Sequence, residues 1–188
     1  MTDSATAGNP ESVNQTQVGC PRIRRAGEPD ADGLATMLTQ LADHSLYFRF
    51  QTAIGRPPRP SLLERLLCPT GGAWVATCED SIVGHAMWAW VANSAEPTAE
   101  LAVVISESEQ HRGLGVRMLA VAAAHAHEAG AQQFLFVVSA ANDRVARMVR
   151  RRWPTAPVER DGPLLNFVVP AEASVAVPRV RETVQPVA

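Results

Sequence analysis

Apolar and polar residues alternate with a helical period through the first third of the chain. Between residues 31 and 41 the apolar positions recur three or four residues apart, at Leu34, Met37, Leu38 and Leu41. This spacing predicts a helix, and Glu28-Pro29-Asp30 just before it supplies a cap. Two further helical segments are expected, one over 46–50 and one that begins at a capping Ser61.

From Gly72 the period changes to that of strands. The segment GGAWVATCEDSIVGHAMWAWV predicts two strands joined by a tight turn at Glu79-Asp80-Ser81, and a short strand at Ile23 precedes the first helix. Residues 100–106, ELAVVIS, are apolar on both faces, which predicts a strand buried in the middle of the sheet. A helix over about 113–128 follows this strand.

The last third of the domain alternates between strand and helix. QFLFVV predicts another buried strand, residues 143–152 predict a helix, and DGPLLNFVV predicts one closing strand after a turn. These elements predict a single domain over 21–170 of α/β (α+β) class, in which helices flank a mixed sheet. Residues 1–20 and 171–188 have the composition of a disordered N-terminal tail and a flexible C-terminal tail.

Composition argues against several classes of protein. The 188 residues suffice for one domain, and a net charge of -2 gives no reason to expect nucleic acid or an anionic membrane as partner. Cys20, Cys68 and Cys78 are odd in number and lack C-x-x-C spacing, which argues against a disulfide framework and a zinc site. The start lacks the features of a secretory signal and no apolar run spans a bilayer, so we expect a cytoplasmic protein.

The segment EQHRGLG between the strand over 100–106 and the next helix carries the candidate chemistry. A helix N-terminus there offers unpaired N–H groups and the positive end of the helix dipole, which suit a phosphate-bearing ligand. Gly113 and Gly115 let the backbone approach that ligand, and Arg112 adds donors. The dinucleotide-binding G-x-G-x-x-G and the Walker G-x-x-x-x-G-K are both absent.

Strand, Q-x-x-G-x-G, helix, strand and helix in this order resemble the GNAT superfamily of N-acetyltransferases over about residues 22–169. AELAVVISESEQHRGLG resembles the branch of that superfamily that acetylates protein lysines, as do SLYFRF ahead of a proline-rich loop and an asparagine before an Arg-rich helix. The resemblance implies a mostly antiparallel sheet, acetyl-CoA as co-substrate and no metal.

The resemblance also implies roles for particular residues. Glu100, at the start of the central strand, falls where many members keep a catalytic glutamate, although a glutamate at a strand start is often simply solvated. The implied cofactor-binding residues comprise three strand residues that bond pantetheine through their backbone, a pyrophosphate loop and one asparagine on the far side: Val103, Val104, Ile105; Gln110, His111, Arg112, Gly113, Leu114, Gly115, Val116; Asn142.

One departure from the family pattern leaves the general acid unassigned. Many members place a tyrosine on the last helix to protonate the leaving thiolate. The corresponding position here is Val149, and the single tyrosine of the chain is Tyr47.

Other clusters are given simpler interpretations. Asp43-His44-Ser45 cannot form a hydrolytic triad from adjacent positions, and His125 and His127 point to nearly opposite sides of a helix, so they do not share a metal. The arginines at 144, 147 and 151 share a helical face, which is either solvated or binds the 3′-phosphate of coenzyme A or an acidic patch on a protein. The aromatic residues of SLYFRF and the strand tryptophans are expected mainly in the core, with the acceptor groove as the alternative.

The sequence therefore predicts an acetyl-CoA-dependent N-acetyltransferase whose acceptor is most plausibly a protein lysine, with acyl-CoA synthetases as frequent targets in the branch it resembles. Two alternatives stay open. The acceptor is a small amine or antibiotic, or the protein is a non-catalytic acyl-CoA-binding sensor, for which the missing tyrosine is the sequence hint.

Overall fold

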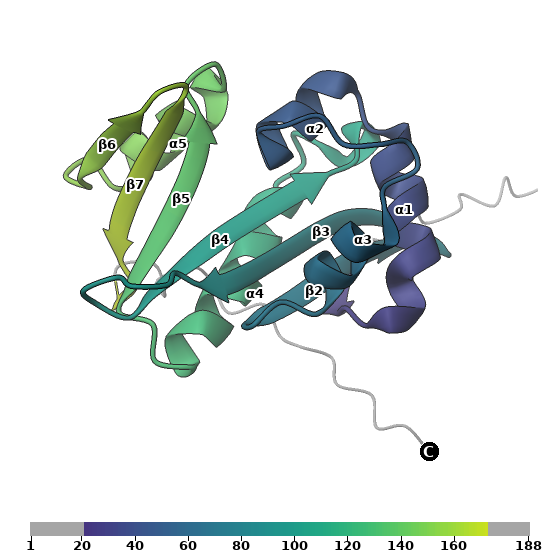
Figure 1. Ribbon diagram of the computed structural model, residues 1–188, viewed down its shortest axis with the longest axis horizontal. Helices are drawn as coiled ribbons and strands as arrows, with labels where there is room; N and C mark the ends of the chain where they lie inside the picture. Colours follow the sequence, from purple (N-terminus) through teal and green to yellow (C-terminus); the bar gives the residue numbers. More distant parts are fainter. Residues whose placement is uncertain (1–20, 173–188) are drawn as a thin grey trace, which may run out of the picture.

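The computed structural model describes residues 21–172, and its ribbon is shown in Figure 1. The two predicted tails lie outside this range apart from residues 171 and 172. Ala171, predicted to begin the C-terminal tail, is fully buried and its N–H donates to the Gln132 carbonyl oxygen at 2.9 Å. Ala171 therefore packs with the folded elements.

Residues 21–172 form seven strands and five α-helices. Their bounds, together with two 3-10 turns, are β1 Arg22–Arg25, η1 Glu28–Asp30, α1 Ala31–Gln40, α2 Asp43–Phe50, α3 Pro60–Leu67, β2 Gly72–Cys78, β3 Ser81–Trp90, β4 Thr98–Ile105, η2 Glu107–Glu109, α4 Leu114–Glu128, β5 Gln133–Ser139, α5 Asp143–Arg152, β6 Val158–Asp161 and β7 Leu164–Pro170.

The strands form one sheet in the order β1-β2-β3-β4-β5-β7-β6, and all neighbours are antiparallel except β4 and β5. This mixed, mostly antiparallel sheet confirms the predicted fold class. The parallel pair is short, because Thr98–Glu100 of β4 pair with Gln133–Leu135 of β5 and the ladder ends there. Beyond it the two strands diverge, and Figure 1 shows β5, β6, β7 and α5 leaning away from the rest of the sheet.

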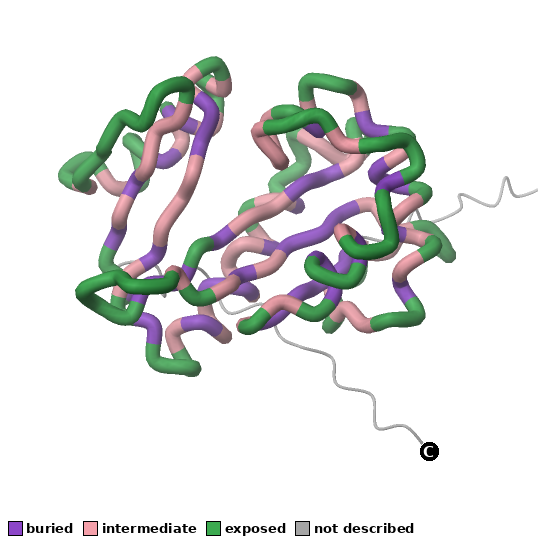
Figure 2. The backbone as a smooth tube through the Cα atoms, viewed as in Figure 1, coloured by how far each residue is buried: buried purple, intermediate pink, exposed green. Residues whose placement is uncertain are grey.

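Helices cover both faces of the sheet. On one face α4 packs against β2, β3 and β4, and Met118 and Ala122 of this helix are fully buried in the main core. On the other face α1, α2 and α3 bury a cluster of leucines together with Val104 of β4. Figure 2 shows that the backbone is buried along the central strands and exposed in the loops. The helical period of residues 31–41 thus corresponds to one buried stripe.

Three local predictions were wrong. The helix predicted to start at Ser61 starts at Pro60 and its N-cap is Arg59, since a proline is well suited to the first helical turn. The segment over 46–50 begins earlier, at Asp43. The predicted cap of α1 is confirmed, since α1 begins at Ala31 with Asp30 as its N-cap; the Asp30 carboxylate, however, accepts hydrogen bonds from Arg24 and from the Gly27 N–H at 2.9 Å and none from α1.

The third error concerns the end of the domain. One closing strand was predicted, whereas β6 and β7 form a hairpin. All four residues of β6, VERD, are exposed, and they lack any alternation of apolar and polar residues. A charged strand at the edge of a sheet leaves no hydrophobic signal, so the sequence pattern could not indicate it.

Candidate functional site

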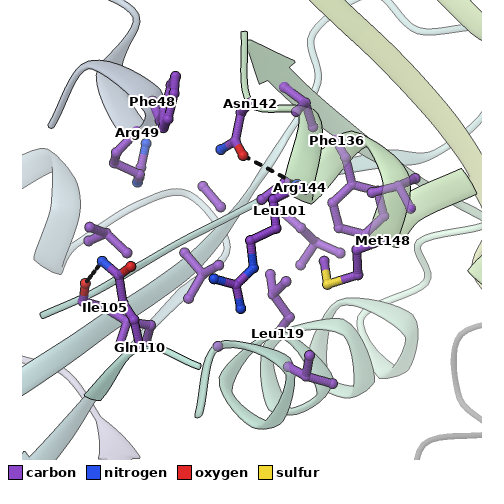
Figure 3. A pocket seen from close by; sticks show the side chains of 18 of the residues that line it. Phe48, Arg49, Leu101, Ile105, Gln110, Leu119, Phe136, Asn142, Arg144 and Met148 are labelled. Carbon is purple, nitrogen blue, oxygen red and sulfur yellow. Dashed lines mark hydrogen bonds between the residues drawn. The ribbon is translucent and has the colours of Figure 1, made fainter. Parts of the chain in front are cut away.

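A cavity of about 990 Å³ lies where β4 and β5 diverge. Its walls come from β4, β5, α2, the N-terminal half of α4 and one face of α5. Figure 3 shows Phe48 and Arg49 entering from one side, and Asn142 and Met148 from the opposite side. We call this cavity the groove.

The register of β4 leaves backbone groups unpaired along the groove. The Val91 N–H donates to the Thr98 carbonyl oxygen and the Ser106 N–H to that of Val83, each at 2.9 Å, so the even-numbered residues of β4 bond to β3. The N–H and C=O groups of odd-numbered residues therefore point toward β5. At Val103, β5 no longer pairs with β4, so these groups have no hydrogen-bonding partner on β5.

This register refines the predicted role of the three strand residues. Val103, Val104 and Ile105 all line the groove. The backbone of Val104, however, pairs with His85 of β3, so it cannot bond a ligand as predicted. Val103 and the N–H of Ile105 face the open side and remain suited to that role.

The loop before α4 presents further N–H groups at the groove. Gly113 is the N-cap of α4 with φ 78°, and the preceding His111 also has a positive φ of 65°. The first intrahelical bond joins the Arg117 N–H to the Gly113 carbonyl oxygen at 3.1 Å. The N–H groups of Leu114, Gly115 and Val116 come before that bond, so the positive end of the helix dipole is available to an anion.

Two residues of this loop are placed differently from the rest. The side chain of Gln110 donates to the Ile105 carbonyl oxygen at 3.1 Å and reaches the Ser45 hydroxyl of α2 at 3.4 Å, so it ties the loop to β4 and α2. Arg112 is the predicted cofactor-binding residue that does not line the groove; it forms an ion pair with Glu109 at 3.3 Å. The other predicted loop residues line it: Gln110, His111, Gly113, Leu114, Gly115 and Val116.

Helix α5 forms the opposite wall. The side-chain oxygen of Asn142 accepts the Val145 N–H at 3.2 Å and so caps α5, and its amide nitrogen is left for the groove (Figure 3). Arg144 donates to the His111 ring across the groove. Val149, at the position where a tyrosine was sought, is 1% exposed and apolar, so it supplies no proton.

The predicted arginine face is partly wrong. Arg144 and Arg147 line the groove, as a common face required, but Arg152 joins them and Arg151 does not. Residues 144, 148 and 152 are spaced by four, and this stripe of α5 is the one turned inward.

Glu100 stands exposed at the foot of the groove, on the face of the sheet that α2 covers. Arg49 of α2 lies nearby, and burial lowers the pKa of its guanidinium to about 10 although the Glu100 charge opposes the shift. His85 of β3 is 1% exposed, and burial together with the Arg49 charge lowers the pKa of its imidazole to about 4. The groove therefore has at this end a carboxylate and a half-buried cation whose Nε is shielded from solvent.

The sequence pattern did not identify Arg49 as a site residue, although it lies in the segment SLYFRF that supports the family resemblance. The signal was one charged residue between Phe48 and Phe50, both of which also line the groove. A cation enclosed by aromatic residues in an otherwise apolar helical turn is a candidate site residue, because a buried charge needs a partner.

The remaining candidates have structural explanations. The ring of His125 accepts a hydrogen bond from the Trp88 indole N–H at 3.1 Å, and Trp88 is buried in the main core. Trp90 and Tyr47 are exposed and do not line the groove. Within residues 21–172, no cluster of three or more His, Cys, Asp or Glu side chains is placed to hold a metal ion. None of the helices in that range is both long and apolar enough to span a bilayer.

The fold and the groove define a class of protein. Free strand N–H and C=O groups, free helix N–H groups and arginines on the facing helix fit a long ligand that combines an amide-bearing arm with phosphates. Acyl-coenzyme A has this chemistry. The space beside the N-cap Gly113 is open, since a Cβ built there would meet nothing within 4 Å.

Comparison with known proteins agrees with this class. Residues 36–152 match the model of the acetyltransferase (GNAT) family, and the chain belongs to that family. It is therefore an acetyltransferase that uses acetyl-CoA as donor and an amine as acceptor.

Solved structures share the fold. The GNAT domain of a Streptomyces protein, S. lividans PAT, superposes with a TM-score of 0.71 at 20% identity, covering 81% of this chain and 91% of that one. The Salmonella typhimurium protein yncA, solved with its cofactor acetyl-CoA, gives 0.61 at 13% identity over 88% and 100%. A ribosomal-protein-alanine N-acetyltransferase from Brucella melitensis gives 0.58 at 20% identity over 78% and 96%. No curated protein matches the chain in sequence.

Proposed function

We propose that the protein is a cytoplasmic N-acetyltransferase that moves the acetyl group of acetyl-CoA to a lysine ε-amine of a protein. The observation that carries the proposal is the groove, which has unpaired backbone groups of β4 along one edge, helix N–H groups at one end and the Glu100 carboxylate at the other. Acetyl-CoA supplies an activated acyl group when it is bound there.

Different residues along the groove bind different parts of acetyl-CoA in this proposal. The amides of Gly113–Val116 bind the diphosphate, and Val103 and the N–H of Ile105 bond the pantetheine arm as an added strand would. The Asn142 amide holds the ligand from the α5 side. Arg144, Arg147 and Arg152 supply positive charge for the remaining phosphate.

Glu100 serves as the base in this proposal. A lysine amine has a reference pKa of about 10.4, so it must lose a proton before it attacks a carbonyl carbon. An exposed carboxylate at the foot of the groove can take that proton directly or through one water. The thiol of coenzyme A has a reference pKa near 8.5 for its class, so its thiolate leaves without a dedicated acid. Departure of the thiolate therefore needs no acid at Val149. No tyrosine is among the residues that line the groove.

Two features support a protein as acceptor. The sequence resembles the lysine-acetylating branch, and the fold is shared with the GNAT domain of S. lividans PAT, a protein acetyltransferase. A small amine or antibiotic is the second candidate for the same chemistry, and a non-catalytic acyl-CoA sensor is the third. They differ in turnover and in the acceptor that gains mass.

The test is incubation of the purified protein with isotopically labelled acetyl-CoA and a cell lysate, followed by mass spectrometry of proteins and small molecules. We expect labelled lysines on a limited set of proteins. The chain has 17 arginines and no lysine, so an untagged protein cannot add a lysine signal of its own. Labelled small amines with unlabelled proteins would favour the second candidate. Calorimetric binding of acetyl-CoA without any release of coenzyme A would favour the sensor.

A further inference from the structure

Within residues 21–172, the Arg49 guanidinium has no hydrogen-bonded or ion-paired partner, although it feels the charge of Glu100. Its Nε atom is shielded from solvent and makes no hydrogen bond. Among the described residues, the hydrogen bonds and ion pairs likewise leave the two terminal nitrogens of Arg49 unused. The guanidinium carbon lies 4.9 Å from the centroid of the Phe50 ring, so the cation packs on an aromatic face that fixes its position.

This arrangement is costly unless something else binds the guanidinium. A buried donor without an acceptor loses its hydration and gains nothing in return, and the loss is larger for a charged group. Burial lowers the pKa of Arg49 to about 10, which still leaves it protonated at neutral pH. Arg49 is one of the residues that line the groove (Figure 3), so an anion that enters the groove comes close to its guanidinium.

The position of Arg49 assigns it to the acceptor end of the groove. One turn earlier on α2, Ser45 contacts Gln110 beside the loop that precedes α4. Helix α2 packs against β4, the strand that carries Glu100, and Glu100 and Arg49 line the same groove closely enough for their charges to interact. The proposed diphosphate site has its own donors in the amides of 113–116 and the arginines of α5, so it does not need Arg49.

We infer that Arg49 binds a carboxylate of the acceptor, so that the preferred substrate is an amine with an acidic group close to the nitrogen. The inference rests on the proposed function. In this inference Glu100 contacts the amine of the acceptor, and the guanidinium of Arg49 binds the carboxylate of the acceptor. A site with one negative and one positive side chain is thus complementary to a substrate with one positive and one negative group. Such a carboxylate belongs either to an acidic residue beside a target lysine or to a free amino acid.

The experiment compares acceptors that differ only in the carboxylate. One pair is a lysine peptide with aspartate beside the lysine and the same peptide with asparagine. The other is a free amino acid and its decarboxylated amine. For the wild-type protein we expect kcat/KM to favour the carboxylate form in at least one pair by about tenfold or more, as for a charge-assisted hydrogen bond. The pair that shows the preference identifies the source of the carboxylate.

Substitution then tests whether Arg49 is responsible. In Arg49→Gln the preference should fall to about threefold or less, and Arg49→Lys should retain part of it because the charge remains while the fork is lost. Arg65→Gln, which removes an exposed arginine of α3 outside the groove, should keep the full preference. Unchanged acetyl-CoA binding by calorimetry shows that each variant is folded.

The outcomes separate the inference from the proposed function. Transfer with no preference in either pair overturns the inference and leaves the acetyltransferase intact. An Arg49→Gln variant that keeps the preference, or that loses acetyl-CoA affinity instead, also overturns it, because Arg49 would then act elsewhere or on the donor. Binding of acetyl-CoA without transfer to any amine overturns the proposed function itself.

Discussion

At the residue scale, Glu100 is the group on which the proposed chemistry depends. Its carboxylate is exposed at the foot of the groove and lies on the side of the sheet that α2 covers. Glu100→Gln keeps the size and polarity of the side chain but removes the base, so kcat should fall by about 10²-fold or more. The calorimetric affinity for acetyl-CoA should stay within about twofold, since the substitution leaves the backbone ladder in place.

A matched substitution controls for the loss of one negative charge. Glu96→Gln alters an exposed residue four positions earlier, outside the groove, and should leave kcat unchanged. Equal kcat values for Glu100→Gln and the wild type would exclude Glu100 as the base.

His85 makes the stability of the fold depend on pH. It is buried beside Leu66, whose carbonyl oxygen lies 3.0 Å from the ring Nε2, and its pKa is lowered to about 4. Unfolded chains bind the proton near pH 6.5, so between about pH 6.5 and 4 the unfolded state holds more protons than the folded state. The free energy of unfolding should therefore decrease as the pH falls through this window, by on the order of 3 kcal/mol from this group.

Urea unfolding followed by tryptophan fluorescence at several pH values measures this dependence. His85→Gln should show a smaller decrease than the wild type between pH 6.5 and 4.5, because glutamine binds no proton. A slope that is the same in both proteins would contradict the role given to His85.

At the scale of elements, packing of α4 on β3 sets where the helix N-terminus lies. A Cβ at Gly84 of β3 would come within 2.8 Å of Ile105 Cδ1 and of Met118 Sδ. Gly84→Ala should therefore cost about 1–3 kcal/mol of unfolding free energy, because the packed side chains of Ile105 and Met118 must move to admit the methyl group. Gly27→Ala is the control, since its Cβ would meet Pro29 Cδ at an ordinary 3.6 Å. Thermal unfolding that shifts equally in both would contradict the close approach.

The elements with a clear period were predictable and those defined by contacts were not. The apolar stripe of α1 and the continuous apolar run of β4 identified both elements and placed β4 in mid-sheet, where it lies. The start of α3 and the hairpin of β6 and β7 were missed, since proline at a first turn and a charged edge strand carry no hydrophobic period. The strand-loop-helix around Gly113 was predictable because helix N-termini next to strands have a local sequence signature.

The candidate site was predictable only where it is local in sequence. Residues 110–116 and Asn142 follow directly from strand ends, and all but Arg112 line the groove. Arg49 joins Glu100 only through the packing of α2 against β4, which is a contact between segments about fifty residues apart. No pattern within one segment could report that contact. The same holds for α5, because its helical pattern alone could not indicate whether Arg151 or Arg152 faces the groove.

At the scale of the whole molecule, the divergence of β4 and β5 is what makes a site. The hydrogen bonds between them stop after Glu100 and Leu135, so the two parts of the sheet are joined by a short paired segment and separate beyond it. Buried side chains of α4 and β5, among them Leu114 and Phe134, hold the two parts together on one face. A ligand that bonds to β4 in the gap replaces the missing strand and should stabilise the whole domain.

Amide hydrogen exchange at single-residue resolution tests that account. The Val103 N–H points into the gap, whereas the Val104 N–H lies in the ladder with His85 of β3. Without acetyl-CoA, Val103 should exchange far faster than Val104 although the two are adjacent in one central strand. Saturating acetyl-CoA should slow Val103 by about 10-fold or more, while Val104 changes only as much as global stability does. Fast exchange of Val103 in both states would mean that the donor does not bond to β4, and the proposed position of the ligand would be wrong.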